Sequence, residues 1–271
     1  MEIFDNHSHS QYSPDGRMQM SEAVEAAVRK PLAGLCISDH YDLECPGGTK
    51  AFSFDVEEQQ GEIDRLQKMY GDRIRLLKGI EVGVQVHCID KVRKLVEDHT
   101  FDQVIASIHF IEGLDPYYGE YYKGYDRKTA YGKYFEHMYT CIKGLENFDI
   151  LGHFDYITRY APYPDYSIKY IDFPDHFDEI FKFLIYNGKV LEINTNTYRE
   201  RDGKCPELDL NILKRYRELG GELVSMGSDA HDTYRVGENL EEYVRKAYSA
   251  GIRYTCHFEN RKLIGTRIIP E

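Results

Sequence analysis

Several common sequence signals are absent from this chain. Its six cysteines are scattered, and no two of them form the Cys-x-x-Cys pair of a zinc ribbon or a thioredoxin-like site. The opening segment MEIFDNHSHS has neither the basic part nor the apolar part of a secretory signal, and no apolar run is long enough to cross a membrane. We therefore predict a cytoplasmic protein whose thiols are reduced.

Positive charge is also scarce. The chain has 34 Lys and Arg against 46 Asp and Glu, which gives a formal net charge of −12. Because nucleic-acid phosphates and anionic membranes attract clustered Lys and Arg, this balance weighs against both as partners. The nucleotide-binding P-loop, the G-x-G-x-x-G fingerprint and the G-x-S-x-G nucleophile elbow are missing too, so a Ser-His-Asp mechanism is the weaker alternative for the chemistry.

Short apolar runs alternate with helical stretches along the chain, without repeats or a long Pro/Gly/Ser linker. Ser21 is the predicted N-cap of the first helix, and Pro174 and Pro206 suit the first turns of two later helices. The runs predict buried strands at 2–4, 34–38, 73–80, 103–108, 148–152, 189–193 and 221–226. The predicted helices are 21–30, 55–70, 88–98, 129–144, 174–187, 206–219 and 238–250. This alternation is typical of parallel βαβ units in one α/β domain.

Polar residues follow almost every predicted strand. In a β/α barrel the functional side chains lie at the carboxyl ends of the strands, whereas a doubly wound sheet is the other fold that the alternation permits. Six of the eleven histidines fall at such ends, and the remaining five fall in helices or connections. The polar groups at strand ends include His7-x-His9, Asp39-His40, Glu81, His109, His153 and Asp229-x-His231. This distribution favours a barrel with one convergent site.

Each of these residues taken alone has a plain structural interpretation, as a surface histidine, a turn residue or a helix cap. Their common placement changes the balance. Imidazoles and carboxylates without thiolates suit zinc, iron or manganese, and the two oxygens of Glu81 are able to bridge two ions. Such ions lower the pKa of a bound water and stabilise a phosphate during its transfer. The pattern therefore predicts a metal-dependent hydrolase.

The ordered series His7-x-His9, Ser38-Asp39-His40, Gly79-Ile80-Glu81, Ser107-Ile108-His109, Gly152-His153-Phe154-Asp155 and Gly227-Ser228-Asp229-Ala230-His231 resembles the polymerase and histidinol phosphatase (PHP) superfamily. The resemblance spans residues 7–231, and the length and the segment 107–113 resemble its histidinol-phosphatase branch. It implies a single domain over residues 1–271, a distorted (β/α)7 TIM-like barrel, with a last strand near 252–256 outside the barrel.

The resemblance also implies a centre of three divalent transition-metal ions, Zn, Fe or Mn. Glu81 would bridge two of the ions, and Asp15 would serve the third. Some members of the superfamily have His where this chain has Asp15, which leaves the affinity and metal preference of the third site open. The implied ligands are His7, His9, Glu81 and Asp229 for the first ion, Glu81, His109 and His153 for the second, and Asp15, His40 and His231 for the third.

The implied reaction is hydrolysis of the phosphomonoester L-histidinol phosphate to L-histidinol and phosphate in histidine biosynthesis, by attack of a metal-bridging hydroxide. Two alternatives stay open. The same superfamily includes phosphoesterases and exonucleases that act on other small molecules or on nucleic-acid ends, although the sequence shows no basic groove. The other alternative is a metal-binding or partner-binding domain without turnover.

Further residues near the predicted strand ends are candidates for contact with the substrate. Arg159 is a candidate phosphate ligand because its planar guanidinium suits bidentate binding, and a surface cation is the alternative. Asp155 would orient a ligand histidine or protonate the leaving group. Asn194, Arg199 and Glu192 are predicted to face the substrate, although asparagines there also suit turn hydrogen bonds. The Tyr- and Gly-rich segment 112–128 follows His109 and would wall the pocket.

Overall fold

The core of the molecule is a mostly parallel sheet. The computed structural model describes residues 2–30, 32–45 and 52–269. In this part of the chain the strands run in the order β1-β2-β4-β5-β6-β7-β8-β9-β10, with β3 beside β4, and only the β9–β10 pair is antiparallel. The strands are β1 (Phe4–Ser8), β2 (Gly34–Ile37), β3 (His40–Asp42), β4 (Arg75–Gly83), β5 (Gln103–Ser107), β6 (Ile150–Leu151), β7 (Val190–Asn194), β8 (Leu223–Gly227), β9 (Tyr254–Glu259) and β10 (Lys262–Arg267).

The sheet closes on itself between β1 and β8. The N–H of Asp229 donates to the carbonyl of His7 at 2.7 Å, and the N–H of His9 donates to the carbonyl of Ala230 at 2.9 Å. Within the described residues, β1, β2 and β4 to β8 therefore form a barrel of seven parallel strands, distorted by the register shift between β1 and β2. The predicted α/β barrel is confirmed.

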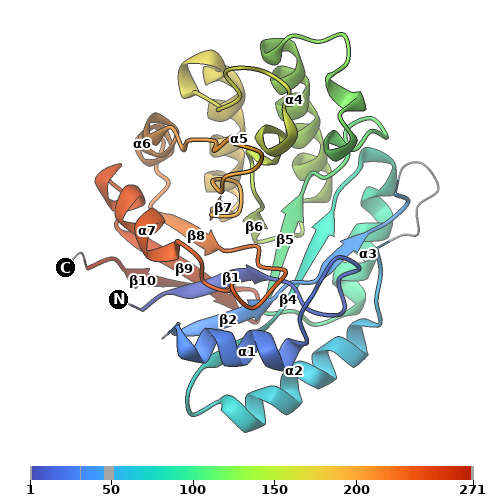
Figure 1. The fold of residues 1–271 in the computed structure, drawn as a ribbon, viewed down its shortest axis with the longest axis vertical. Coiled ribbons are helices and arrows are strands. Elements are labelled where there is room, and N and C mark those ends of the chain that lie inside the picture. The colour runs from blue at the N-terminus through green and yellow to red at the C-terminus, as the bar shows by residue number, and fades with distance from the viewer. Residues whose placement is uncertain (1, 31, 46–51, 270–271) are drawn as a thin grey trace.

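Helices alternate with the strands and cover the outside of the barrel (Figure 1). Their apolar faces pack on the barrel in one continuous core. Each strand of the seven-stranded barrel is joined to the next one by such a helix, which returns along the outer face. The helices are α1 (Met20–Arg29), α2 (Val56–Tyr70), α3 (Ile89–Asp98), α4 (Arg127–Leu145), α5 (Pro174–Tyr186), α6 (Leu210–Glu218) and α7 (Leu240–Ser249).

Two predicted helix starts are wrong, and one is confirmed. Helix α1 is capped by Gln19 instead of Ser21, because Glu22 accepts a hydrogen bond from the Gln19 N–H at 2.7 Å. Helix α6 begins at Leu210 and not near Pro206, because Asp209 supplies the cap by accepting from the Asn211 N–H. Pro174 does lie in the first turn of α5.

The C-terminal hairpin closes the lower end of the barrel, which is the end at which the parallel strands begin. The upper end is the one at which they finish. Strand β9 pairs in parallel with the start of β8, and its Cys256 and Phe258 pack on side chains that point into the barrel from β5, β6 and β7. The last strand predicted near 252–256 is thus present outside the seven-stranded ring, but it belongs to the same sheet. Strand β10 was not predicted because its side chains are mostly exposed and lack an apolar pattern.

No helix in the described ranges is both long and apolar enough to cross a membrane.

Candidate metal centre

The first group of donors joins the ends of β1, β4 and β8. His7 Nε2 lies 3.3 Å from Glu81 Oε2, and His9 Nε2 lies 3.1 Å from Asp229 Oδ1. The cross distances are also short, at 3.7 Å from His9 Nε2 to Glu81 Oε2 and 3.9 Å from His7 Nε2 to Asp229 Oδ1. Since His7 and His9 are alternate residues of an extended segment, both side chains point to the same side. Two imidazoles and two carboxylates therefore surround one point.

The second group lies on the other oxygen of the same carboxylate. Glu81 Oε1 is 2.8 Å from His153 Nε2 and 3.2 Å from His109 Nε2. These histidines follow β6 and β5, the two strands that come after β4 in the order of the sheet. Glu81 thus presents one oxygen to each group, which is the geometry of a carboxylate that bridges two ions.

A third group lies toward the opening. His231 Nε2 is 3.4 Å from His40 Nε2 and 3.2 Å from Asp15 Oδ2, and His40 Nε2 is 3.9 Å from Asp15 Oδ1. The other nitrogen of His40, Nδ1, is 2.6 Å from Glu81 Oε2, so this group is contiguous with the first. The nine candidate ligands therefore lie together in space. The strand-end residues among them were expected to converge from the sequence pattern, and Asp15 from the family resemblance alone.

The donor atoms are arranged to bind cations and not to hydrogen-bond with one another. His7 Nε2, His40 Nδ1 and Glu81 Oε2 are buried without a hydrogen-bond partner among the described residues, although His40 Nδ1 and Glu81 Oε2 are only 2.6 Å apart. Buried polar atoms are normally satisfied, so close atoms without hydrogen-bond angles indicate donors aimed at a shared ion. Potential ligand atoms of three residues at a time also lie within 4.8 Å of one another, for example those of His7, His9 and Glu81.

The electrostatics keep the carboxylates ready to bind metal. Burial alone would raise the pKa of Glu81, but the surrounding histidines, His40 and His7 foremost, hold it well below its ordinary range. Burial is opposed in the same way at Asp229, where the neighbouring arginine and His7 keep the pKa low. Burial and two neighbouring histidines lower the pKa of His9, which favours the neutral imidazole that binds metal.

Two buried carboxylates orient histidines that are candidate metal ligands. Glu192 Oε1 lies 2.7 Å from His7 Nδ1, and its Oε2 accepts from the His153 N–H at 2.6 Å. Asp42 Oδ1 lies 2.8 Å from His109 Nδ1. Such contacts fix the imidazole tautomer and orientation. Glu192 was predicted to face the substrate, whereas Asp42 was missed, although its position two residues after His40 in a strand is a signal that it shares the same face.

The local backbone is shaped for this crowding. A Cβ at Gly227 would lie 2.2 Å from Glu192 Oε1 and 2.6 Å from the Cβ of His7, so only glycine fits between them. Asp229, two residues later, has a φ of 49°, a left-handed conformation that is uncommon for a residue with a side chain. Backbone strain of this kind concentrates at functional sites, where surrounding structure holds it in place.

Arg159 lies beside the first donor group. Its Nη1 is 2.9 Å from Asp229 Oδ2, its Nη2 donates to Asn194 Oδ1 at 3.0 Å, and its Nε donates to Thr197 Oγ1 at 3.1 Å. A guanidinium has five N–H groups, so two remain for another acceptor as far as the described residues show. Burial opposes a raised pKa here, but Asp229 prevails, and the arginine is fully charged.

Asp155 and Arg199 take different positions relative to the centre. Asp155 is buried, does not line the cavity in front of the donors, and accepts hydrogen bonds from the Tyr198 hydroxyl and from Thr197 Oγ1 at 3.0 Å. Its burial raises its pKa to about 6, although Tyr198 opposes this shift. Arg199 does line the cavity and lies 3.5 Å from Glu238.

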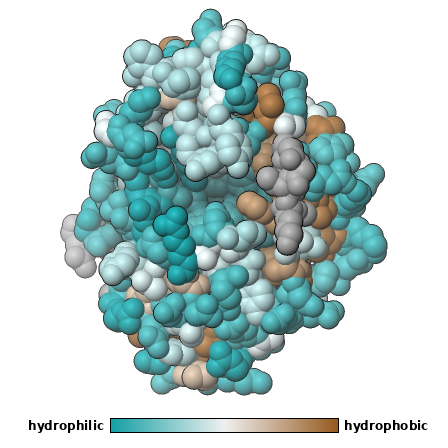
Figure 2. Space-filling model, turned by 45° about the vertical axis from the view of Figure 1, so that its right-hand side comes forward, coloured by the Kyte–Doolittle hydropathy of each residue, from teal (hydrophilic) through white to brown (hydrophobic). Residues whose placement is uncertain are grey.

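A cavity of about 480 Å³ opens in front of the donor groups. Figure 2 shows one face of the molecule, mostly hydrophilic, with a hollow near its centre and hydrophobic side chains to one side. The lining combines metal-ligand candidates with four arginines and with aromatic side chains from three loops. The arginines are Arg17, Arg159, Arg199 and Arg235, and the aromatic residues are Phe52, Phe110, Tyr117, Tyr118, Tyr156 and Tyr160.

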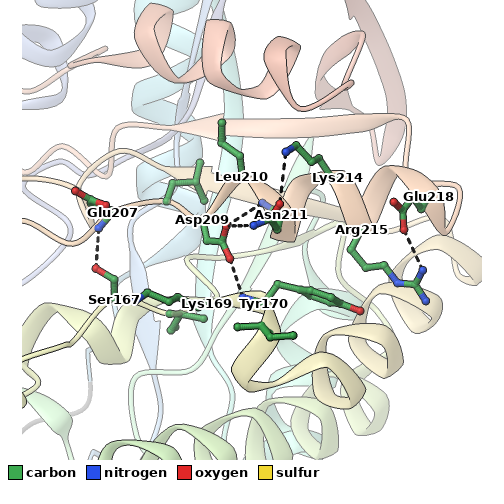
Figure 3. Close-up of a pocket in the computed structure, with 13 residues that line it drawn as sticks. Ser167, Lys169, Tyr170, Glu207, Asp209, Leu210, Asn211, Lys214, Arg215 and Glu218 are labelled. Carbon is green, nitrogen blue, oxygen red and sulfur yellow. Dashed lines mark hydrogen bonds and ion pairs between the residues drawn. The ribbon is translucent and has the colours of Figure 1, made fainter.

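A second cavity, of about 570 Å³, lies between the start of α6 and the segment 167–171 (Figure 3). Its polar groups bond to neighbours: Asp209 accepts from the Tyr170 N–H, and Arg215 pairs with Glu218. None of the nine predicted metal ligands lines it. This cavity is large, but its lining does not indicate a role in the chemistry.

The pattern of the PHP domain matches residues 5–196, which is more than half of the chain. This chain belongs to the PHP domain family. The matched region carries seven of the nine predicted ligands and ends before Asp229 and His231, so the closure of β8 on β1 completes a donor set that the family pattern begins.

Two relatives match this PHP protein over nearly its whole length. It is 34% identical to the "Probable histidinol-phosphatase" of Clostridium acetobutylicum, over 96% of this chain and 98% of the relative. It is 30% identical to the histidinol-phosphatase of Lactococcus lactis, over 97% of both chains. The crystal structure of the histidinol phosphate phosphatase from Lactococcus lactis, complexed with zinc, L-histidinol and phosphate, superimposes with a TM-score of 0.89, at 28% identity, over 97% of this chain and 99% of that one.

Proposed function

We propose that this protein hydrolyses L-histidinol phosphate to L-histidinol and phosphate, a step of histidine biosynthesis. The observation that carries the proposal is the convergence of Glu81 with eight other histidine and carboxylate side chains in a metal-dependent phosphoesterase of the PHP family. Full-length similarity to proteins named histidinol-phosphatase supports the choice of substrate.

Each donor group would hold one divalent ion. When bound, such ions supply a water of lowered pKa as nucleophile and positive charge for the phosphoryl oxygens. Glu81 would be shared between the first two ions, because its two oxygens face different groups. The assignment is His7, His9, Glu81 and Asp229 for the first ion, Glu81, His109 and His153 for the second, and Asp15, His40 and His231 for the third.

Arg159 would bind the phosphate. Three of its N–H groups are used by Asp229, Asn194 and Thr197, which fixes the plane of the guanidinium. The remaining two N–H groups suit a phosphate that lies against the metal centre, since two donors on one planar group match two phosphate oxygens. Asn194 would act through this arginine instead of touching the substrate itself.

Asp155 would act as a positioning residue and not as the proton donor to the leaving group. Its carboxylate accepts from Thr197 Oγ1, and the same hydroxyl accepts from Arg159 Nε. The chain from Asp155 through Thr197 thus holds the arginine from behind, outside the cavity. Arg199 is different: it lines the cavity, its Nε has no hydrogen-bond partner in the described part of the chain, and its Nη1 lies 3.5 Å from Glu238 Oε2. We therefore keep it as a candidate for substrate contact.

A panel of substrates tests the proposal. The purified protein is assayed with histidinol phosphate, p-nitrophenyl phosphate and single-stranded DNA, before and after metal removal by a chelator. We expect the highest kcat/KM for histidinol phosphate, loss of turnover on chelation and recovery with Zn²⁺ or Mn²⁺. Preference for DNA ends or for p-nitrophenyl phosphate would assign the protein to another branch of the family, and no turnover of any of them would support a domain without catalysis.

A further inference from the structure

Another group of possible metal ligands lies at the start of α3 (Figure 1). It combines Glu44, from the segment after β3, with His87 and Cys88, from the connection between β4 and α3. One potential ligand atom from each of these three residues lies within 4.8 Å of those of the other two. None of the three residues lines the cavity in front of the metal centre. The group is therefore separate from the nine candidate ligands of that centre.

The chemistry of this group differs from that of the catalytic centre. Cys88 supplies a thiol, whereas none of the nine candidate ligands at the catalytic centre is a cysteine. A thiolate, an imidazole and a carboxylate together suit a divalent ion such as zinc, and thiolates also bind cadmium. Mn²⁺ and Mg²⁺ prefer oxygen ligands and gain little from sulfur. The donor set therefore favours zinc over the harder ions.

The distances within the group are compatible with one ion. Zinc bond lengths of about 2.0 to 2.3 Å place the ligand atoms of a tetrahedral site roughly 3.3 to 3.8 Å apart. His87 Nε2 lies 3.4 Å from Glu44 Oε2, which is within this range. Lys91 pairs with the other oxygen of Glu44, Oε1, so Oε2 is the atom that faces the histidine. Three protein ligands leave the fourth position of a tetrahedral ion to water.

The surroundings give an ion access from solvent and a preformed frame. The side chains of Glu44 and His87 are 46% and 56% exposed, whereas Cys88 is fully buried. Two contacts already join the segments that carry these ligands. Gln85 Nε2 donates to the Leu43 carbonyl at 2.9 Å, and Cys88 Sγ lies 3.9 Å from the same carbonyl. An ion would therefore bind between two segments that are held together in its absence.

We propose that Glu44, His87 and Cys88 form a separate site for one zinc ion, which joins the segment after β3 to the start of α3. The Cys88 thiol gives its proton to solvent when it binds the ion, so the sulfur coordinates as a thiolate. The segment after β3 begins directly after Asp42, whose carboxylate lies 2.8 Å from His109 Nδ1. The ion would stabilise a segment next to the catalytic centre without taking part in the reaction.

Cadmium tests the site through its sulfur ligand. A cadmium–thiolate bond has a charge-transfer absorption in the ultraviolet, and cadmium at the catalytic centre lacks this band because no candidate ligand there is a thiol. We expect Cd²⁺ added to the Mn²⁺-loaded protein to produce the band with the intensity of a single thiolate ligand per chain. Cys88→Ala should abolish the band.

His87→Ala keeps the thiol and tests the site without changing the core, because the His87 side chain is exposed. We expect the Cd²⁺ concentration that half-saturates the band to rise about tenfold or more when one ligand of three is lost. Cys205→Ser is the matched control, because Cys205 is an exposed thiol outside this group, and it should leave the band unchanged. Zn²⁺ should raise the thermal unfolding midpoint of the Mn²⁺-loaded wild type more than that of His87→Ala, since ligands stabilise the state that binds them.

Several outcomes would overturn the site. They are absence of the band in the wild type, its persistence in Cys88→Ala, and its loss in Cys205→Ser, which would assign the sulfur to another cysteine. Loss in Cys88→Ala with unchanged Cd²⁺ affinity in His87→Ala would also refute the three-ligand site, because a lone thiol would then hold the ion. None of these measurements uses histidinol phosphate, so the site and the proposed function stand or fall separately.

Discussion

The two ends of the barrel are built from the same strands and have opposite chemistry. On β5, Ile105 points into the lower barrel, and two residues later Ser107 donates a hydrogen bond to Glu81 at 2.7 Å. On β7, Val190 belongs to the lower apolar cluster, and two residues later Glu192 holds His7. One step of two residues along an inward-facing row therefore separates the packing layer from the metal centre.

This difference indicates where stability and function reside. The lower end is closed by Phe258 and Cys256 of β9, which bury apolar surface. The upper end buries donor atoms without hydrogen bonds, such as Glu81 Oε2, and such atoms oppose folding unless an ion satisfies them. We therefore expect substitutions at the lower end to change the free energy of unfolding and substitutions at the upper end to change metal binding and turnover.

Glu81→Gln should have the largest effect on activity. The change keeps the size of the side chain but removes the negative charge that faces both donor groups. We expect kcat to fall by more than about a thousandfold, with fewer ions bound per chain. Turnover is measured with histidinol phosphate, and metal content by elemental analysis of the purified variant.

Retention of full turnover or of the wild-type metal content in Glu81→Gln would contradict the bridging role of this carboxylate. Glu97→Gln serves as the control, since Glu97 is exposed on α3, and it should behave as the wild type.

Phe258→Ala should have the largest effect on stability. Phe258 is 2% exposed in the apolar cluster at the lower end, and its removal leaves a cavity. We expect the free energy of unfolding to fall by about 3 to 5 kcal/mol, with kcat of the folded protein unchanged. Denaturant unfolding and steady-state assays at low temperature measure the two quantities.

Leu263→Ala is the matched control for Phe258→Ala, because Leu263 lies on the partner strand of the same hairpin and is 42% exposed. It should change the free energy of unfolding by less than about 0.5 kcal/mol. A large loss of turnover in folded Phe258→Ala would show that the two ends are coupled.

The sequence predicted the convergence of these histidines and carboxylates because its signal is periodic and local. Apart from Asp15, which lies in a loop, each candidate ligand lies at or just after the end of an apolar run, and parallel strands bring such ends to one rim. The convergence of His7, His109 and Asp229 confirms this reasoning. Parallel strand order also follows from the alternation with helices, so the barrel was predictable.

The remaining features depend on contacts that sequence spacing does not encode. Glu192 lies near the end of a strand, as the candidate ligands do, yet its carboxylate contacts His7 Nδ1 and not the cavity. Sequence spacing does not show how deep in the barrel a side chain lies. Asp42 belongs to a three-residue strand too short to detect from its pattern. The start of α6 was misplaced because Asp209, an ordinary acidic residue in sequence, also accepts from the distant Tyr170 N–H.

Glu192→Gln should have an intermediate effect on metal affinity and turnover. The size of the effect shows whether Glu192 belongs to the metal centre at the upper end or to the packing layer at the lower end. Glutamine keeps an oxygen for one contact, but it cannot serve both His7 and the His153 N–H as a carboxylate does. Loss of such a supporting group lowers metal affinity or activity by roughly 10- to 100-fold. Metal titration monitored by turnover measures this change. An unaltered titration curve would place Glu192 with the packing residues and not with the metal centre.

The smallest effect is expected outside the barrel, at the pair Asp178 and Arg215 between α5 and α6. Two hydrogen bonds from Arg215 lower the pKa of Asp178 from about 3.9 for an exposed carboxyl. A depressed pKa means that the pair stabilises the fold fully above about pH 4, and that this contribution is lost as the pH falls through the lowered pKa. Asp178→Asn should therefore unfold slightly more easily than the wild type near neutral pH, and the two should become equal in acid.

Thermal unfolding of Asp178→Asn and the wild type at a series of pH values, with turnover at pH 7 as the reference, measures this difference. A difference in unfolding midpoint that stays constant into acid would show that the pair stabilises the helices by packing alone, and a change in turnover would show that the outer helices influence the upper rim.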